Sequence, residues 1–342
     1  MPIKADAQNH LPALSAVLVT PDNFSTIRKT VAKLKQQTKR EQIELVLVAP
    51  DAQTLDLPPG TADGFFSLHI VEVGPHRLIA FARAAGAKAA RAPIIAYTED
   101  HCFPEHDWAE KIIDAPWEEY AAVAPRFCNG NPRTAQSWAD YFLNFGTWHE
   151  PGPSCEMTRL PWHNTAYKRE VLLRHGDKLE RMLEVEGELQ NDMTQRGERL
   201  YLESAARVHH LNMSYLPSCA HELFNAGRLF GGTHAQKWNS FRRALYILLA
   251  PMVFVSRLRG QLAHLQRHTR ANVESKMRVV HIGALMVLGS LLHIAGEAVG
   301  YARGVGATAK RKSDYESHRL RHLCRADRDI EDSSLRELDA TP

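Results

Sequence analysis

Short apolar runs alternate with stretches of helical periodicity along the first hundred residues. Each run has the length and composition of a buried strand. The runs are Leu14 to Thr20, Glu44 to Ala49, Leu68 to Val73 and Ile94 to Thr98. Strands that alternate with helices in this way are typical of a sheet covered by helices. The pattern therefore predicts an α/β fold with a mostly parallel central sheet.

Two segments between the strands are expected to form helices. After the first strand, apolar residues recur at helical spacing, and Asp22 or Asn23 can cap the helix. These apolar residues are Phe24, Ile27, Val31 and Leu34. The second helix, between Leu78 and Ala90, has small residues on one face: Ala82, Ala85, Gly86 and Ala89. Because small side chains let a helix approach a sheet closely, we expect this helix to pack directly on the strands.

The composition fits a folded protein of a reducing compartment. The chain has 342 residues, of which 44% are hydrophobic and 24% charged, enough for one large domain or about two ordinary ones. Its five cysteines are widely spaced and form no Cys-x-x-Cys pair, so neither a disulfide framework nor a structural zinc site is indicated. The first residues lack the apolar stretch of a signal peptide. We therefore expect a cytoplasmic location.

The net charge of +3 hides an uneven distribution. Residues 226–278 contain ten Lys and Arg residues and one acidic residue, as expected of a segment that faces phosphate groups. Within it, the apolar run from Ala244 to Val255 is too short to cross a bilayer and is flanked by arginines, which favours an interfacial helix. The run from Val279 to Gly300 has the length of a span but includes two histidines and Glu297. Helices buried in the protein are the alternative for both runs.

These patterns divide the chain into three parts. Residues 1–232 are expected to form the α/β domain, and residues 233–309 a basic and apolar helical region that associates with the cytoplasmic side of a membrane. Residues 310–342 mix acidic and basic side chains with few large apolar ones, so a flexible charged tail is expected. Aromatic and basic residues are not interleaved, which argues against a nucleic-acid partner.

Polar residues follow several predicted strands, and open parallel sheets bind ligands at such strand ends. Asp22, Asp51 and the cluster Glu99-Asp100-His101 lie there. Because Glu99 and His101 are two residues apart, their side chains project to the same side of an extended chain and can share a metal ion. A carboxylate with an imidazole suits manganese or similar ions. A polar loop after an edge strand is the alternative.

The glycine-rich loops that commonly bind phosphate groups are missing. The sequence has no Gly-x-Gly-x-x-Gly after the first strand and no Gly-x-x-x-x-Gly-Lys-Ser/Thr. A phosphate ligand at this sheet therefore needs another source of positive charge, and a divalent metal is the usual substitute.

The order of these parts resembles that of family 2 glycosyltransferases of the GT-A fold. Where the family carries an Asp-x-Asp motif followed by proline, this sequence has Glu99-Asp100-His101 and then Pro104. Some relatives have Asp-x-His, with the histidine on the metal. Three further segments resemble the donor and acceptor segment, the stretch with the catalytic base, and the strand that ends in a histidine near the diphosphate. They are WHNTAYKRE at 162–170, EGEL at 186–189 and ARVHH at 206–210.

The resemblance covers residues 14–232 and implies a Rossmann-like GT-A domain with membrane-associated C-terminal helices. It implies sugar transfer with inversion from a UDP-sugar to a lipid-linked or saccharide acceptor in glycolipid or surface polysaccharide synthesis. The implied cofactor is Mn²⁺ or Mg²⁺ on Glu99 and His101. The implied catalytic base is Glu186, with Glu188 as the next candidate and Glu184 as a further one. The residues implied in donor binding are Thr20, Pro21, Asp51, Arg83, Asp100, Asn164 and His210.

Two other classes of protein fit parts of the sequence. A non-catalytic relative that binds a nucleotide sugar is suggested by the replacement of the usual aspartates. A metal-dependent nucleotidyltransferase would use Glu99 and Asp100 but would leave the region around Glu186 without a role. The aromatic residues between 138 and 148 are expected in the core or in an acceptor-side wall, and Trp108 is expected to pack inward.

Overall fold

A computed structural model describes the chain over most of its length. The described residues are 11–75, 78–149, 152–161, 163–184, 187–271 and 275–340. The chain forms two compact units. Unit 1 comprises residues 1–99, 105–125 and 155–206, and unit 2 comprises residues 100–104, 126–154 and 207–342.

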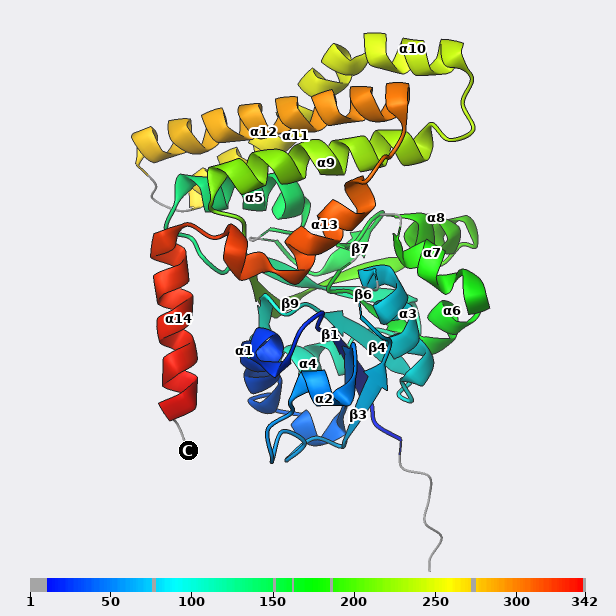
Figure 1. The fold of residues 1–342 in the computed structure, drawn as a ribbon, viewed down its shortest axis with the longest axis vertical. Coiled ribbons are helices and arrows are strands. Elements are labelled where there is room, and N and C mark those ends of the chain that lie inside the picture. The colour runs from blue at the N-terminus through cyan, green and yellow to red at the C-terminus, as the bar shows by residue number, and fades with distance from the viewer. Residues whose placement is uncertain are drawn as a thin grey trace, which may run out of the picture. The chain divides into compact units, whose positions relative to one another are not determined.

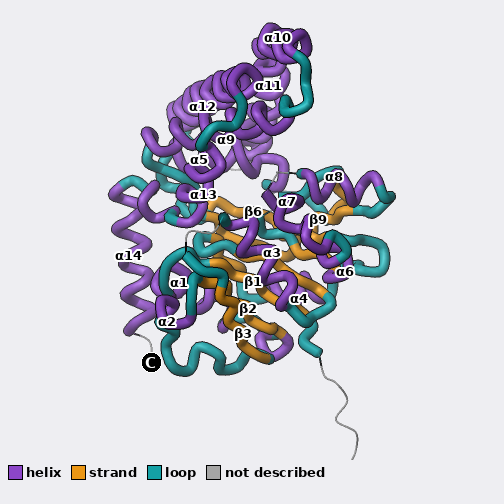
Figure 2. The backbone as a smooth tube through the Cα atoms, turned by 45° about the vertical axis from the view of Figure 1, so that its right-hand side comes forward, coloured by secondary structure: helices purple, strands orange, loops and turns teal. Residues whose placement is uncertain are grey.

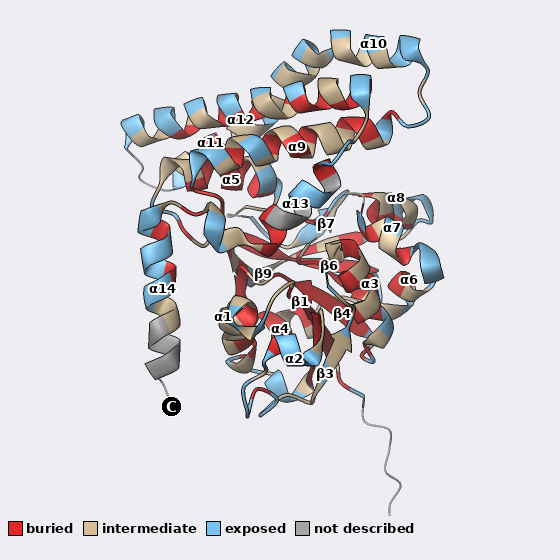
Figure 3. Cartoon of the chain, in the orientation of Figure 1, coloured by how far each residue is buried: buried red, intermediate tan, exposed pale blue. Residues whose placement is uncertain are grey.

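Unit 1 contains the four parallel strands that the sequence predicts. They are β1 (Leu14–Val19), β2 (Ile43–Ala49), β3 (Ser67–Glu72) and β4 (Ile94–Thr98). β1 pairs in parallel with β2 and β4, and β3 pairs in parallel with β2. Figure 2 shows β1, β2 and β3 next to one another. β2 and β4 are buried along their whole length, as expected for parallel strands covered on both faces (Figure 3). The predicted α/β architecture is confirmed.

The sheet continues beyond β4 with antiparallel pairs, so it is mixed rather than parallel throughout. The strand order is β3-β2-β1-β4-β8-β6-β9-β5, and β7 pairs with β9. The additional strands are β5 (Cys102–Pro104), β6 (Ala122–Asn129), β7 (Cys155–Met157), β8 (Ala166–Lys168) and β9 (Leu200–His210). β8 pairs antiparallel with β4 and β6, and β5 pairs antiparallel with β9.

The helices and turns of unit 1 include both helices that the sequence predicts between the strands. They are α1 (Phe24–Lys35), α2 (Ala52–Leu55), α3 (Ile79–Ala89), α4 (Trp108–Ile113), α6 (Arg169–Leu173), α7 (Leu179–Glu184), α8 (Glu188–Gln195) and the 3₁₀ turns η1 (Arg40–Gln42) and η3 (Gly176–Lys178). Asn23 caps α1 by accepting a hydrogen bond from the Ser25 amide at 3.1 Å. A Cβ atom on Gly86 would lie 2.5 Å from Val17 Cγ1, so α3 packs directly on β1 as expected. Trp108 is buried, as predicted.

Unit 2 is dominated by helices. They are α5 (Ala135–Phe145), η2 (Gly146–Trp148), α9 (Leu216–His234), α10 (Ser240–Leu248), α11 (Ala250–Ala271) and α12 (Lys276–Arg303). α9 and α12 run side by side (Figure 1). A Cβ atom on Gly227 would lie 2.0 Å from the His293 carbonyl oxygen, so the two backbones touch. Among the described residues, α12 is the helix with the length and apolar composition to cross a membrane.

The C-terminal segment is helical, whereas the sequence predicts a flexible tail. It forms α13 (Thr308–Ser317), the 3₁₀ turn η4 (Arg319–His322) and α14 (Arg325–Ala340). The segment is anchored by buried side chains, because Leu323 is fully buried against Phe103 and Leu211. Asp327, at the start of α14, is 2% exposed. A few well-placed anchors therefore order a segment whose overall composition is polar.

The anchoring predicts that Leu323→Ala lowers the free energy of unfolding by about 2–5 kcal/mol, because it removes a fully buried side chain and leaves a cavity. Leu320→Ala is the matched control, since Leu320 is 36% exposed in the same segment. Urea denaturation followed by circular dichroism measures both. Equal, small effects of the two substitutions would contradict the anchoring.

Candidate metal and donor site

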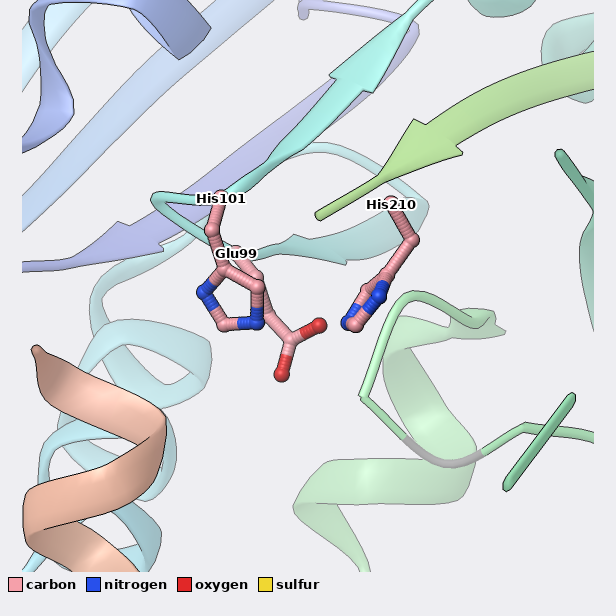
Figure 4. Close-up of side chains that lie close together, drawn as sticks. All are labelled: Glu99, His101 and His210. Carbon is pink, nitrogen blue, oxygen red and sulfur yellow. The ribbon is translucent and has the colours of Figure 1, made fainter. Parts of the chain in front are cut away.

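A cluster of one carboxylate and two imidazoles lies at the carboxyl end of β4. The chain leaves β4 at Thr98 and passes through Glu99 and His101 into β5. β5 pairs with the end of β9, with Cys102 opposite His210. The candidate ligand atoms of Glu99, His101 and His210 all lie within 4.8 Å of one another. Figure 4 shows these three side chains pointing toward one another.

Glu99 is buried and held by polar partners on both carboxylate oxygens. Its Oε2 accepts a hydrogen bond from Asn164 Nδ2 at 2.6 Å, while its backbone N–H donates to Asn164 Oδ1 at 3.1 Å. Its Oε1 lies 3.4 Å from an Arg83 nitrogen and 3.1 Å from His163 Nδ1. A buried carboxylate requires such partners, because desolvation otherwise disfavours its charge. The partners fix the direction in which Glu99 points.

Each histidine has a fixed partner at Nδ1. His101 Nδ1 lies 2.5 Å from Asp100 Oδ1, a contact in which the carboxylate accepts a hydrogen bond from the ring nitrogen. His210 Nδ1 lies 3.1 Å from Asn212 Oδ1. Burial, with smaller contributions from His101 and Arg319, holds the pKa of His210 well below its usual value, so its ring is neutral at pH 7. Both rings can therefore offer Nε2 as a ligand atom.

The donor set fits a divalent metal ion. One carboxylate oxygen and two imidazole nitrogens suit manganese and similar ions, and three protein ligands leave positions open for substrate oxygens. The polar contacts behind each ligand resemble those that usually orient metal ligands. The sequence predicted that Glu99 and His101 share a metal and that His210 lies near the diphosphate. The structure brings all three together.

The residues predicted to bind the nucleotide have structural contacts of their own. Thr20 and Pro21 follow β1, and the Thr20 amide donates to the Val48 carbonyl at 2.9 Å. Asp51 begins α2, where Oδ1 accepts a hydrogen bond from the Thr54 amide at 2.6 Å. Hydrogen bonds from Thr54 lower the pKa of the Asp51 carboxyl group. Asp51 thus caps α2 with its side chain, and donor binding at Thr20, Pro21 and Asp51 stays a prediction.

Three other residues predicted to bind the sugar donor contact the candidate metal ligands. Arg83 and Asn164 contact Glu99. Asp100 contacts His101. His163 and Asn212 support the cluster as well, although the sequence did not single them out. His163 lies next to Asn164 in a family-like motif, which is a usable signal. Asn212 lies beyond the last resembling segment, and no local pattern marks it.

The region of the predicted catalytic base is only partly described. Glu186 lies outside the described residues. Glu188 is the first residue of α8 and follows Gly187, which has a φ of 80°. Its carboxylate lies 3.7 Å from Arg181 Nε, and its side chain is 31% exposed. The assignment of the base to Glu186 or Glu188 therefore stays a prediction.

Searches with the sequence alone identify no relatives: no protein-family model matches it, and no curated protein matches it significantly. Among solved structures, the chain is similar to GalNAc-T7 with UDP, GalNAc and Mn²⁺, at 18% identity and a TM-score of 0.45. That match covers 60% of this chain, which spans only 44% of the length of the GalNAc-T7 chain. S. aureus TarS 1–349 matches at 14% identity and a TM-score of 0.44, and its complex with UDP at 13% and 0.45. Both TarS matches cover 84% of this chain and 90% of TarS 1–349.

The cluster predicts that Mn²⁺ binds to the protein and that His101→Ala and His210→Ala each weaken this binding by more than about tenfold, since each removes a ligand atom. Isothermal titration calorimetry measures the affinities. His209→Ala is the matched control, because neighbouring strand residues point to opposite faces. Unchanged affinity in both ligand variants would disprove the site.

Proposed function

We propose that this chain is a metal-dependent glycosyltransferase of the GT-A type that moves a sugar from a UDP-sugar to a hydroxyl acceptor with inversion. The observation that carries the proposal is the buried cluster of Glu99, His101 and His210. It lies at the carboxyl end of β4 in an α/β sheet, where ligands of such sheets collect. It also coincides with the segment that resembles the metal motif of family 2 glycosyltransferases.

The proposed reaction is a single displacement. The acceptor oxygen attacks the anomeric carbon from the face opposite the diphosphate, the bond from that carbon to the diphosphate oxygen breaks, and the configuration inverts. The acceptor proton passes to the carboxylate of Glu186, with Glu188 as the alternative. Glu99, His101 and His210 would hold the metal ion, which would supply positive charge to stabilise the leaving diphosphate. Arg83 adds a second positive charge behind Glu99.

The acceptor is proposed to be a lipid-linked or surface saccharide, reached from the cytoplasmic side of a membrane. α10 and the start of α11 expose large apolar side chains at helical spacing: Phe241 is 78% exposed, Leu248 77% and Met252 70%. Exposed apolar side chains beside many basic residues are typical of helices that lie in the interface of an anionic membrane. The basic segment 226–278 supplies these residues.

Transfer activity is tested by incubating the protein with radiolabelled UDP-sugars and Mn²⁺. We expect slow hydrolysis or transfer with release of UDP, lost in His101→Ala because the ligand set is then incomplete. Release of pyrophosphate would instead favour a nucleotidyltransferase. Binding of UDP-sugars without any turnover, in the presence of membrane extract as an acceptor source, would favour a non-catalytic binding protein.

The base is assigned by two matched substitutions, Glu186→Gln and Glu188→Gln. We expect Glu186→Gln to keep the affinity for the UDP-sugar and to lower the turnover number by about 10²–10⁴-fold, because no general base then accepts the proton of the acceptor hydroxyl. Glu188→Gln is expected to stay within a few-fold of the unmodified protein. The opposite pattern would assign the role to Glu188.

Membrane association is tested by sedimentation with vesicles of phosphatidylglycerol and with vesicles of phosphatidylcholine. We expect binding to the anionic vesicles alone, weakened more than tenfold by the double substitution Leu248→Asp and Met252→Asp. Each side chain contributes roughly 1.5–3 kcal/mol when it leaves water. Ile330→Asp, in α14, is the control for an added charge on a partly exposed side chain. Equal binding of all variants would rule out this surface.

A further inference from the structure

Three asparagines form a buried hydrogen-bond network at the end of β9. Asn129 is 9% exposed, Asn131 7% and Asn212 0%. Asn131 contacts Asn212 through two hydrogen bonds, and Asn212 contacts Asn129 through another. The side-chain nitrogen of Asn212 makes the contact with Asn129, and its side-chain oxygen lies next to Nδ1 of His210. This network has no role in the displacement proposed above, yet it ends on a candidate metal ligand.

Backbone groups fix the orientation of two of the three amides. The backbone N–H of Asn212 lies 2.8 Å from one side-chain atom of Asn131, and that atom must therefore be the oxygen. The Asn212 carbonyl lies 2.9 Å from the other atom, which must be the nitrogen. In the same way, the Asn131 amide N–H lies 3.0 Å from Oδ1 of Asn129 and identifies that atom as an acceptor. A backbone N–H only donates and a carbonyl only accepts, so no other assignment satisfies these contacts.

The orientation of Asn212 follows from these anchors. One of its side-chain atoms lies 3.0 Å from the Asn129 oxygen and 3.0 Å from the His210 carbonyl, so it must be the nitrogen. The other atom is then the oxygen, and it lies 3.1 Å from His210 Nδ1. Because an amide oxygen only accepts hydrogen bonds, the proton of the neutral ring must sit on Nδ1. His210 is left with its lone pair on Nε2.

We propose that Asn212 is a positioning residue that fixes His210 in the Nδ1–H tautomer and so presents Nε2 to the metal. The inference rests on the proposed metal site, but the tautomer itself is a property of the metal-free protein. Without this amide, the two neutral tautomers of imidazole are close in energy, and the Nε2–H form cannot bind a metal through Nε2. Because His210 already has the tautomer that binds a metal, no free energy is spent on changing the tautomer when the metal binds.

The network extends to the C-terminal helix. Asn131 Nδ2 also donates to Oδ2 of Asp327 at 2.9 Å, and Asp327 lies at the start of α14. Since a carboxylate oxygen accepts, this contact agrees with the orientation that the backbone assigns to Asn131. The Ser137 hydroxyl oxygen lies 3.0 Å from the side-chain oxygens of both Asn129 and Asn131, and its single proton is donated to one of them. The asparagine network is thus bound both to α14, through Asp327, and to α5, through Ser137.

The test is a long-range ¹H–¹⁵N spectrum of metal-free protein labelled at histidine, with the His210 signals assigned by comparison with His210→Ala. The expected result is a protonated Nδ1 and an unprotonated Nε2. A proton on Nε2 in the unmodified protein would overturn the inference, whatever the transferase assays show. The readout needs neither metal nor sugar donor, so failure of the proposed function would not be mistaken for failure of the tautomer assignment.

Two substitutions separate the acceptor role from packing. Asn212→Leu removes the acceptor, so we expect a mixture of tautomers and Mn²⁺ affinity weakened about 10- to 100-fold. Asn212→Asp keeps an acceptor for Nδ1 but loses the donor to the Asn129 oxygen and the His210 carbonyl. We therefore expect this variant to retain the Nδ1–H tautomer and to bind Mn²⁺ more weakly than the unmodified protein but more tightly than Asn212→Leu. Asn144→Leu, at an exposed position of α5, is the control. A purely structural role would lower the affinity in both Asn212 variants alike and leave the tautomer unchanged, which would overturn the proposal.

Discussion

The antiparallel pairing of β5 with the end of β9 is the interaction on which the candidate site depends. It sets Cys102 opposite His210 and thereby brings two imidazoles together although more than a hundred residues separate them in the chain. Once these groups are buried beside Glu99, each needs polar partners, because desolvation disfavours charges and unpaired polar groups. Arg83, Asn164 and the asparagines of the network are placed where these requirements arise.

Local patterns in the sequence were sufficient for the parallel half of the fold. Alternating apolar runs and helical spacing located β1 to β4, and the small residue Gly86 correctly indicated a close approach of α3 to the sheet. The two-residue spacing of Glu99 and His101 was enough to group them. His210 could be placed near the diphosphate only through the resemblance to family 2 glycosyltransferases, because antiparallel pairing between distant strands leaves no periodic signal in the sequence. The register of β5 on β9 decides its position.

The C-terminal third shows where composition misleads. Residues 310–342 have few large apolar side chains, so composition predicts a flexible tail, yet one fully buried leucine and one buried carboxylate anchor this segment. The long apolar run within α12 has the composition of a membrane span. Its glycines nevertheless pack against the backbone of α9, where a Cβ on Gly296 would lie 2.1 Å from the Phe224 carbonyl. Small residues at such spacing allow close helix packing in water and in lipid alike, so the sequence alone does not distinguish them.

The departure from two aspartates has an electrostatic consequence for the proposed reaction. Two carboxylate ligands neutralise a divalent ion, whereas Glu99 and two imidazoles, which bind a metal in their neutral form, leave one positive charge on the same ion. Asp100, hydrogen-bonded to His101, offsets this charge from outside the ligand set, and Arg83, 3.4 Å from Glu99, restores it. A site with excess positive charge holds the metal less tightly by itself but attracts a diphosphate more strongly. Metal and nucleotide would therefore bind cooperatively, each raising the affinity for the other by the same factor.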